Sequence, residues 1–313
     1  MPSQRQIRQQ ITNRIVAALE QDLLPWRRPW RQVSSPNVGR PVNVVSRNTY
    51  RGINPILLEL HSLHYGFQSR WWATFRQWQG LGCSVMRRPT DVEPGQWGAR
   101  VVFYRQVSKT VTKENGEERD EQFPVMRYFT VFNAEQVEGE VAERYQVQDD
   151  PETREVGPDF EPADELVAAT EAEIRHGGDR AFYTRPVSFD DWPNHDAGDH
   201  IVVPPKHQFE SVGSYYEAAF HELGHWSEIR TGWDHREQGY PMGELVAEIA
   251  ASFLSAELGV PQGETLENHV AYLQSWLAEM KNDPSYIFRA SAQASKVTDY
   301  LLSFTRQPEE VAT

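Results

Sequence analysis

The sequence has a single cysteine, Cys83, in 313 residues. One cysteine forms neither a disulfide within the chain nor a cysteine-built zinc site, which excludes disulfide-stabilised secreted domains and zinc ribbons. No apolar run approaches the roughly 18 residues of a membrane span, and no apolar signal segment follows the polar residues after Met1. These absences predict a soluble protein of a reducing cytoplasm, without a membrane partner.

Acidic residues are scarce in the first third of the chain and abundant after it. Residues 1–105 hold 15 Lys and Arg against 5 Asp and Glu, whereas residues 106–313 hold 16 against 40, so the net charge of −14 combines two opposite parts. The basic part is suited to a polyanion, which the acidic part would repel. Because the length allows two domains with cores of their own, charge predicts two parts with different partners.

The clearest chemical motif is H-E-x-x-H, formed by His221, Glu222 and His225. Two imidazoles four residues apart lie one turn apart on one face of a helix, so both can bind one divalent cation. Glu222 projects from an adjoining face, where it can act as general base on a metal-bound water. Ser214 and Glu217 form an S-x-x-E capping box, which predicts that the helix begins there. The alternative is a helix with two surface histidines and an incidental glutamate.

A second predicted helix offers the third protein ligand that a catalytic zinc site needs. It covers residues 243–253, and Gly259 followed by a proline supplies the stop signal. Glu244 and Glu248 lie one turn apart on one face, and the alanines between and after them allow the two helices to approach closely. The alternative is two solvated glutamates on an amphipathic helix.

H-E-x-x-H followed about twenty residues later by E-x-x-x-(D/E) resembles the gluzincin class of zinc metallopeptidases. The resemblance implies that His221, His225 and Glu244 bind Zn²⁺, with Mn²⁺ as the alternative ion. It also implies that Glu222 is the general base, and that Glu248 orients a ligand histidine or is itself the ligand. The register between the two glutamates of the second helix stays open.

The first third of the chain predicts a small α+β domain over residues 1–138. We expect a helix over 4–22, an extended arm over 24–31, and a helix over 54–65 closed by Gly66. A second short helix is expected over 70–78, followed by strands over 83–87, 99–107 and 125–133. Residues 139–161 are acidic and contain prolines, which is typical of a linker.

Aromatic residues alternate with arginines in this first third. A positive groove with aromatic platforms on which bases stack is the arrangement that binds single-stranded nucleic acid. The alternative is that about half of the tryptophans form the core and that the arginines make structural cation–π contacts. The candidate DNA-binding residues are Trp26, Arg27, Arg28, Trp30, Arg47, Tyr50, Arg51, Trp71, Trp72 and Arg76.

Several short motifs in this region resemble one family. They are P-W-x-x-P-W at 25–30, Y-R-G-I-N at 50–54, W-x-T-F-x-Q at 72–77 and F-T-V-F-N at 129–133. Together they are similar to the N-terminal domain of the ArdC antirestriction proteins, which TraC-type plasmid primases share. The resemblance implies that the partner is single-stranded DNA and that the protein protects incoming plasmid DNA from host restriction.

The remainder, residues 162–313, is predicted to be a mostly helical, zincin-like metallopeptidase domain. We expect a helix over 163–176, short strands over 180–183 and 199–205, and helices over 264–281 and after 283. Residues 200–203 are predicted to form an edge strand on which a peptide substrate could pair. The order G-G-D-R-A-F-Y, V-P-P and H-E-L-G-H-W also resembles the ArdC peptidase domain. The roles of His269, Tyr272, Tyr183 and Tyr216 stay open.

The predicted function therefore has two parts: binding of single-stranded DNA without sequence readout, and metal-dependent cleavage of an unknown protein, for which a host restriction component is the candidate. One rival is a cytosolic metallopeptidase whose front domain recognises protein. A second is a DNA-binding protein whose metal site is structural or catalytically idle. A third is an acidic back half that mimics DNA.

Overall fold

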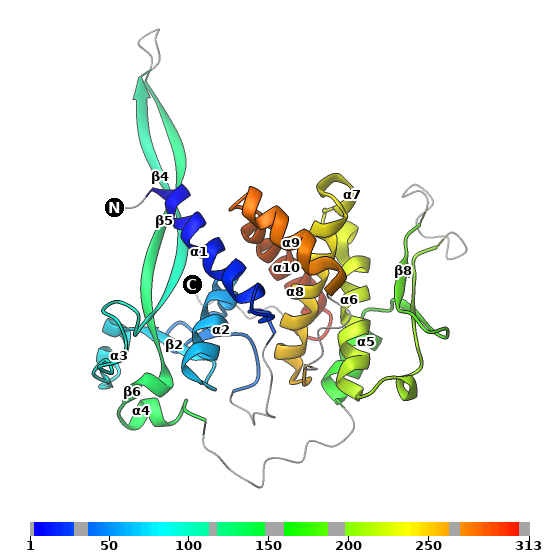
Figure 1. Ribbon diagram of the computed structural model, residues 1–313, viewed down its shortest axis with the longest axis horizontal. Coiled ribbons are helices and arrows are strands. Elements are labelled where there is room, and N and C mark those ends of the chain that lie inside the picture. Colours follow the sequence, from blue (N-terminus) through cyan, green and yellow to red (C-terminus); the bar gives the residue numbers. More distant parts are fainter. Residues whose placement is uncertain are drawn as a thin grey trace.

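The computed structural model describes residues 3–27, 37–112, 118–147, 160–186, 198–262 and 270–306. Three residues singled out in the sequence, Arg28, Trp30 and His269, lie outside these ranges. The front part combines sheets and helices, and the back part is mostly helical, as Figure 1 shows, which confirms the predicted α+β class. Within the described residues no helix is both long and apolar enough to cross a bilayer.

The front part is built on a four-stranded sheet of order β1-β2-β5-β4. Strand β1 runs parallel to β2, and the other neighbours are antiparallel. Two helices flank the sheet, and a third follows β2. These elements are β1 (Val42–Asn43), β2 (Trp71–Thr74), β4 (Ala99–Thr112), β5 (Glu118–Asn133), α1 (Gln4–Leu19), α2 (Asn54–Tyr65) and α3 (Phe75–Gly80).

The predicted helix over 70–78 is wrong in its first half. Residues 71–74 form β2, and the helix begins only at Phe75, because Thr74 and Gln77 cap its N-terminus reciprocally. The predicted helix over 54–65 is confirmed, and Gly66 ends it with a positive φ of 76°. Beneath the sheet lie η1 (Ala134–Gln136), α4 (Glu140–Glu143) and the antiparallel pair β3 (Ser84–Val85) and β6 (Val137–Glu138).

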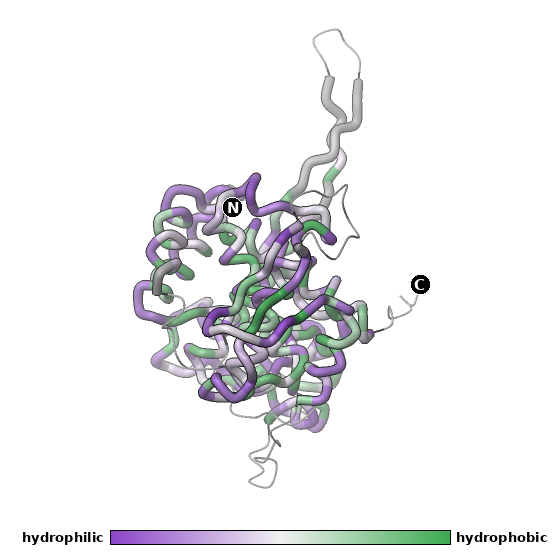
Figure 2. The backbone as a smooth tube through the Cα atoms, turned by 90° about the vertical axis from the view of Figure 1, so that its right-hand side faces the viewer, coloured by the Kyte–Doolittle hydropathy of each residue, from purple (hydrophilic) through white to green (hydrophobic). Residues whose placement is uncertain are grey.

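Strands β4 and β5 form a hairpin much longer than the sequence predicts. They pair from Ala99 opposite Val131 to Thr112 opposite Glu118. The two strands project away from the body of the molecule (Figure 1), and Figure 2 shows the alternation of hydrophobic and hydrophilic residues in the body from which they leave. The inner part of the hairpin is anchored by the Asn54 amide, which bonds both the backbone N–H and the carbonyl of Val102 at 2.8 and 2.9 Å.

The back part begins with α5 (Glu161–Ala169) and a three-stranded sheet of order β7-β9-β8. Its strands are β7 (Glu173–His176), β8 (Phe182–Thr184) and β9 (His200–Val203). The predicted helix over 163–176 is therefore wrong in its last turn, which is β7. The predicted edge strand at 200–203 is central instead, because β7 and β8 pair with its two sides. The edge on the side of the functional cleft is β8.

Five helices complete the back part: α6 (Val212–Arg230), α7 (His235–Gln238), α8 (Tyr240–Leu258), α9 (Val270–Asn282) and α10 (Tyr286–Leu302). The predicted capping box at Ser214 is wrong. Helix α6 begins two residues earlier, and the Ser211 hydroxyl accepts a hydrogen bond from the Ser214 backbone at 3.0 Å. The predicted stop of α8 at Gly259 is confirmed by its left-handed backbone, with a φ of 70°.

The first helix packs against the last ones. The apolar stripe of α1 lies in the same hydrophobic core as the buried residues of α8, α9 and α10. The Thr12 hydroxyl donates to the Pro284 carbonyl at 2.8 Å, and the ring of Trp26 packs edge-on against Trp276 with centroids 5.9 Å apart. A segment that the sequence assigns to the front domain thus completes the core of the back part.

Buried charges also join the two parts. Arg40, which is 4% exposed, donates to Glu257 of α8 at 2.7 Å and to Asp299 of α10 at 3.0 Å. Arg306 binds the other Glu257 oxygen at 2.8 Å. Burial disfavours the charged carboxylate, but the charges and hydrogen bonds of the two arginines lower the pKa of Glu257 to about 2.

We expect Glu257 to make the stability of the fold depend on pH in the acid range. A carboxyl whose pKa is lower in the folded chain than the unfolded value of 4.5 stabilises the fold above that value, and this contribution is lost as the pH falls through the folded pKa of about 2. Its size is on the order of 3 kcal/mol. Urea unfolding of the wild type and Glu257→Gln should differ most at neutral pH and converge towards pH 2. A difference that stays constant with pH contradicts the assignment.

Candidate metal centre

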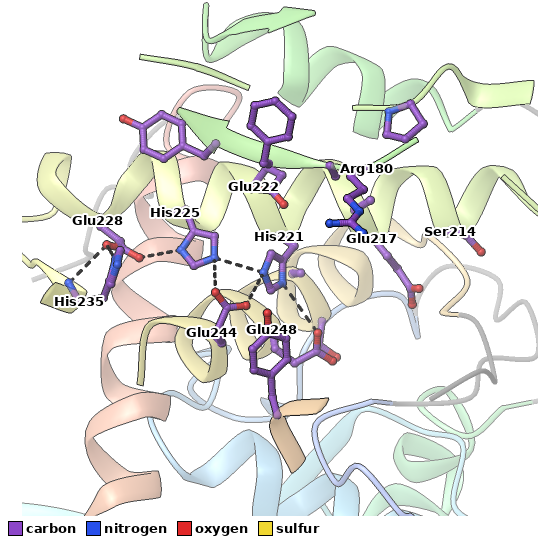
Figure 3. Close-up of a pocket in the computed structure, with 18 of the residues that line it drawn as sticks. Arg180, Ser214, Glu217, His221, Glu222, His225, Glu228, His235, Glu244 and Glu248 are labelled. Atoms are coloured by element: carbon purple, nitrogen blue, oxygen red, sulfur yellow. Dashed lines mark hydrogen bonds and ion pairs between the residues drawn. The ribbon is translucent and has the colours of Figure 1, made fainter. Parts of the chain in front are cut away.

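Three side chains from two helices converge in the cleft of the back part. His221 and His225 lie on α6, with their Nε2 atoms 3.2 Å apart. Glu244 of α8 approaches from the facing helix: its two oxygens lie 3.4 Å from His221 Nε2 and 3.5 Å from His225 Nε2. Figure 3 shows the two rings turned towards this carboxylate. These residues form a site for one divalent metal ion, as predicted for His221, His225 and Glu244.

The spacing of these atoms matches a tetrahedral cation site. Ligands about 2.0–2.1 Å from a tetrahedral ion lie about 3.3 Å from one another. The two Nε2 atoms are 3.2 Å apart, and each has its own Glu244 oxygen at a similar distance, Oε2 at 3.4 Å from His221 and Oε1 at 3.5 Å from His225. Two imidazoles and one carboxylate are also the donor set of a catalytic zinc centre, with a fourth position left for water. The donor set and the closeness of the three side chains therefore fit a divalent cation.

The close approach of the two helices depends on a glycine in the motif. A Cβ atom at Gly224 would lie 3.1 Å from the Cα atom and 3.3 Å from the Cβ atom of Ala247. Even a methyl group at Gly224 would therefore require the two helices to separate by a few tenths of an ångström. The sequence predicted this role for the alanines of α8; the glycine of H-E-L-G-H contributes from the other side.

Glu222 lies beside the imidazoles on the side that faces β8 (Figure 3). Its carboxylate is 7% exposed and interacts with the backbone of Tyr183 in β8. Burial raises the pKa of Glu222, against the opposite pull of His221 and His225. A carboxylate with a raised pKa next to the metal position is suited to accept and return a proton. The structure thus places Glu222 in the cleft with the three converging side chains, and its role as general base stays a prediction.

The electrostatics of the ligand set favour a positive charge. Burial alone would lower the pKa of His221, but the hydrogen bond to Glu244 and the neighbouring carboxylates raise it to about 9. Burial would raise the pKa of Glu244, but its hydrogen bond to His221 and the charges of the two histidines lower it. Both shifts have the same physical cause, a cluster of carboxylates around the imidazoles, and that cluster favours a bound cation at this position.

A carboxylate lies on the Nδ1 side of each ligand histidine, away from the Nε2 atom that faces Glu244. Glu248 Oε2 lies 4.0 Å from Nδ1 of His221, which agrees with the predicted supporting role rather than with ligation. Glu228, which was not predicted from the sequence, accepts from Nδ1 of His225 at 2.8 Å and also contacts His235 at 2.5 Å. Its position three residues after His225 on the same helix face was the available signal. Such partners fix the tautomer and orientation of a ligand ring.

We expect Glu228→Gln to weaken metal binding by about 10- to 100-fold, because a neutral amide oxygen accepts more weakly from Nδ1 of His225 than a carboxylate does. Helix α6 should persist, since glutamine has a similar helix propensity and shape. Competition with a chromophoric chelator measures the affinity, and far-ultraviolet circular dichroism checks the helix. The matched control is Glu237→Gln on α7, an exposed glutamate outside the cluster. Equal affinity in the two variants contradicts a supporting role for Glu228.

The cleft around the site has a volume of about 750 Å³ and is bounded by β8, α6 and α8. Tyr240 and Tyr272 lie at its rim with their hydroxyls 3.0 Å apart, and burial raises the pKa of Tyr240. Arg185 closes one end by a bidentate pair with Asp234, at 2.9 and 2.8 Å. A cleft of this size next to an edge strand can hold several residues of an extended peptide.

The hydroxyls of the other two described tyrosines with open roles make structural contacts. Tyr183 donates to Asp199 at 2.8 Å, and Asp199 also accepts from Arg230 of α6 at 2.7 Å, so this group fastens the β8 sheet to the motif helix. The Tyr216 ring is fully buried, and its hydroxyl bonds the Lys206 ammonium at 3.0 Å. Of the four open residues, Tyr272 is the one in the described part of the chain whose hydroxyl lies at the rim of the cleft.

Several predicted DNA-binding residues lie elsewhere than expected. Trp26, Tyr50 and Trp72 are 2%, 6% and 1% exposed, so no ring face is open to a base, and their assignment as stacking platforms is wrong. Trp72 is buried because alternate residues of β2 point into the sheet core. Arg27 is corrected too: its side chain is 13% exposed and lies in the metal cleft, 3.0 Å from Glu248 and 3.7 Å from Glu217.

The remaining described candidates lie at the surface of the front part. Arg47 and Arg76 are exposed, and Trp71 is half-buried. The guanidinium of Arg47 lies 4.9 Å from the centroid of the Trp71 ring, which is a structural cation–π contact. Arg51 is exposed and pairs with Asp299 of α10. For these four residues, contact with DNA stays a prediction.

Comparison with known proteins agrees with this geometry. A family model of the N-terminal domain of anti-restriction factor ArdC matches residues 5–132, and a model of zincin-like metallopeptidases matches residues 161–293. The metal-free crystal structure of the antirestriction protein ArdC from plasmid R388 has a TM-score of 0.72 and 31% identity, over 95% of this chain and 97% of that one. Its Mn(II)-bound structure has a TM-score of 0.66, 30% identity and the same coverage.

Two curated relatives have other names. A DNA primase TraC of Escherichia coli is 33% identical over 96% of this chain, which spans only 27% of the primase's length. The uncharacterized protein y4eC of Sinorhizobium fredii is 30% identical over 94% of this chain and 91% of its own. The match to ArdC over both parts, together with the two histidines and the glutamate in the cleft, shows that the chain belongs to the ArdC family of antirestriction proteins and carries a zincin-like metallopeptidase domain.

Proposed function

We propose that the chain is an antirestriction protein that binds single-stranded DNA through its front part and hydrolyses a protein through its back part. The observation that carries the hydrolytic half is the convergence of His221, His225 and Glu244 beside a buried Glu222 in an open cleft. A structural site would be closed by a fourth protein ligand, whereas these three leave one side to the cleft. The DNA-binding half rests on family membership and on the basic composition of the first third.

The roles of the residues follow from their positions. A divalent cation, Zn²⁺ by its donor set or Mn²⁺ by analogy with the Mn(II)-bound R388 protein, supplies Lewis acidity for a peptide carbonyl and its attacking water. Glu222 takes the proton of that water on its carboxylate and returns it to the leaving amine. The free edge of β8 hydrogen-bonds the backbone of an extended substrate, and Glu228 and Glu248 hold the imidazoles in place.

A test of the peptidase half uses purified protein, labelled unfolded casein and a host restriction enzyme as substrates. We expect cleavage of one of them after loading with Zn²⁺ or Mn²⁺, loss of cleavage with a chelator, and recovery on adding the metal back. Elemental analysis follows the metal in parallel. Full metal loading without cleavage of either substrate favours the rival in which the metal site is idle.

A test of the DNA-binding half is the salt dependence of binding to a labelled oligothymidine. Binding that rests on phosphate contacts weakens steeply with salt, with a slope of about −0.7 per phosphate neutralised in a plot of log K against log salt concentration. We expect tight binding at low salt, with little difference between base sequences. No binding at low salt favours the rival in which the front part recognises protein.

A further inference from the structure

The predicted aromatic platforms are largely buried, yet one element of the front part does expose aromatic rings. Among the described residues, four of the ten exposed large hydrophobic side chains lie on the hairpin β4–β5. They are Phe103, Tyr104, Val107 and Phe129, which are 47%, 51%, 36% and 44% exposed. Exposed apolar groups gathered on one projecting element usually mark an interaction surface.

Two of these rings form a pair on one face of the hairpin. The register places Phe103 opposite Arg127 and Phe129 opposite Val101, so both rings and Arg127 lie on the same face. The ring centroids are 5.3 Å apart and the ring planes meet at 87°. On the other face Val102 and Met126 are buried in the core that includes α1. On the face of the pair Val101 is buried in the core that includes Trp72, so the base of the hairpin packs on both sides while the two rings stay close to half exposed.

The charged residues in this part of the hairpin are all positive. Segments 97–108 and 122–132 contain three arginines and no aspartate or glutamate. Arg100 and Arg127 are both exposed, and in the described part of the chain no carboxylate lies within ion-pair distance of either. The guanidinium of Arg100 lies 5.8 Å from the centroid of the Tyr128 ring, on the face opposite the phenylalanine pair. Arginines without carboxylate partners are available to phosphate groups.

From these observations we propose that the surface of Phe103, Phe129 and Arg127, here called the hairpin platform, is where single-stranded DNA binds. The inference rests on the proposed DNA-binding function and assigns it to residues other than those that the sequence indicated. Unpaired bases stack on the two phenylalanine rings, and Arg127, on the same face, contacts a backbone phosphate. Duplex DNA is a poor ligand, because its bases are stacked on one another and offer no free face.

The platform differs from the two tryptophans at 71–72 in how much of its ring faces is accessible to a base. Trp72 is 1% exposed, and Trp71 is occupied by the guanidiniums of Arg47 and Arg70 at 4.9 and 5.4 Å. By contrast, the rings of the platform are close to half exposed and are anchored on a backbone with paired hydrogen bonds. Such rings lose little freedom when a base stacks on them.

The test is fluorescence anisotropy of a labelled oligothymidine with the full chain and the variant Phe103→Ala/Phe129→Ala. Each lost stacking contact should reduce affinity by about 5- to 150-fold. The matched control is Phe75→Ala, which removes an equally exposed phenylalanine, 52% exposed, from α3 of the same part. Phe103→Trp keeps a ring at the platform and should bind at least as tightly as the wild type, which separates loss of stacking from misfolding.

The outcomes separate the inference from the proposed function. Weak binding by the double alanine variant, with wild-type-like binding by the Phe75→Ala and Phe103→Trp variants, supports the platform. If the wild type binds and the double alanine variant binds equally well, the platform is wrong, the DNA-binding function stands, and the aromatic pair is a surface for a protein partner. If the wild type does not bind at low salt, the DNA-binding function fails and the platform fails with it.

Discussion

Replacing Glu222 by glutamine is expected to lower the rate of peptide cleavage by about 10²- to 10⁴-fold while the metal stays bound. The amide has the size of the carboxylate but cannot accept a proton from water. None of the three atoms that face the cation position belongs to Glu222, so the ligand set is unchanged. Initial rates on labelled substrate measure the loss, and elemental analysis of the same sample measures the metal.

Glu217→Gln is the matched control for this experiment. Glu217 lies on the same helix one turn before the motif and lines the same cleft, but it is not near the three converging atoms. It should retain most of the activity. A Glu222→Gln protein as active as this control would mean that another group supplies the base. Unchanged affinity for single-stranded DNA in both variants would show that the two proposed activities use different residues.

The second large effect is expected from Arg27→Met. Arg27 precedes the front sheet in sequence, yet its guanidinium lies 3.0 Å from Glu248, whose side chain is 4% exposed. Removing one partner of a buried ion pair costs about 3–5 kcal/mol, because the remaining charge loses its compensation. Glu248 also faces the Nδ1 atom of His221, so we expect metal affinity to fall by about 10- to 100-fold as well.

Two measurements separate these effects. Urea unfolding of the chelated protein gives the stability loss, and chelator competition at low denaturant gives the loss of metal affinity. Arg27→Lys keeps the charge and should recover part of both. The control is Arg180→Met, which removes an exposed arginine that lines the same cleft. If Arg27→Met leaves metal affinity intact and weakens DNA binding instead, the sequence-based assignment of Arg27 to the DNA surface is restored.

The positions of the metal ligands could be predicted from sequence because they depend on local geometry. Helical spacing places His221 and His225 on one face, and small residues in the next helix indicate where Glu244 can approach. Glu228 has the same kind of local signal, three residues after His225. No such local signal marks Arg27. It contacts Glu248, which lies 221 positions away, and only the path of the chain after α1 brings the two together.

The exposure of the candidate DNA-binding residues was harder to predict, because composition does not reveal which face of an element is covered. Trp71 and Trp72 are neighbours of the same type, but β2 turns one into the core and leaves the other half-buried. The arginines near them in sequence favoured the prediction that both rings are exposed. The length of the β4–β5 hairpin was also missed, since its outer segments lack the apolar alternation that a sheet with one buried face requires. The sequence pattern therefore does not indicate that Phe103 and Phe129, at the base of the hairpin, are exposed.

The core shared by α1 and α9 ties the unfolding of the two parts together. Helix α1 cannot detach without exposing the apolar side chains that it covers, so the chain is expected to melt as one cooperative unit. By thermodynamic linkage, a cation bound between α6 and α8 then also stabilises residues that it does not contact. Each tenfold rise in free cation above its dissociation constant adds about 1.4 kcal/mol to the stability of that unit, the first helix included.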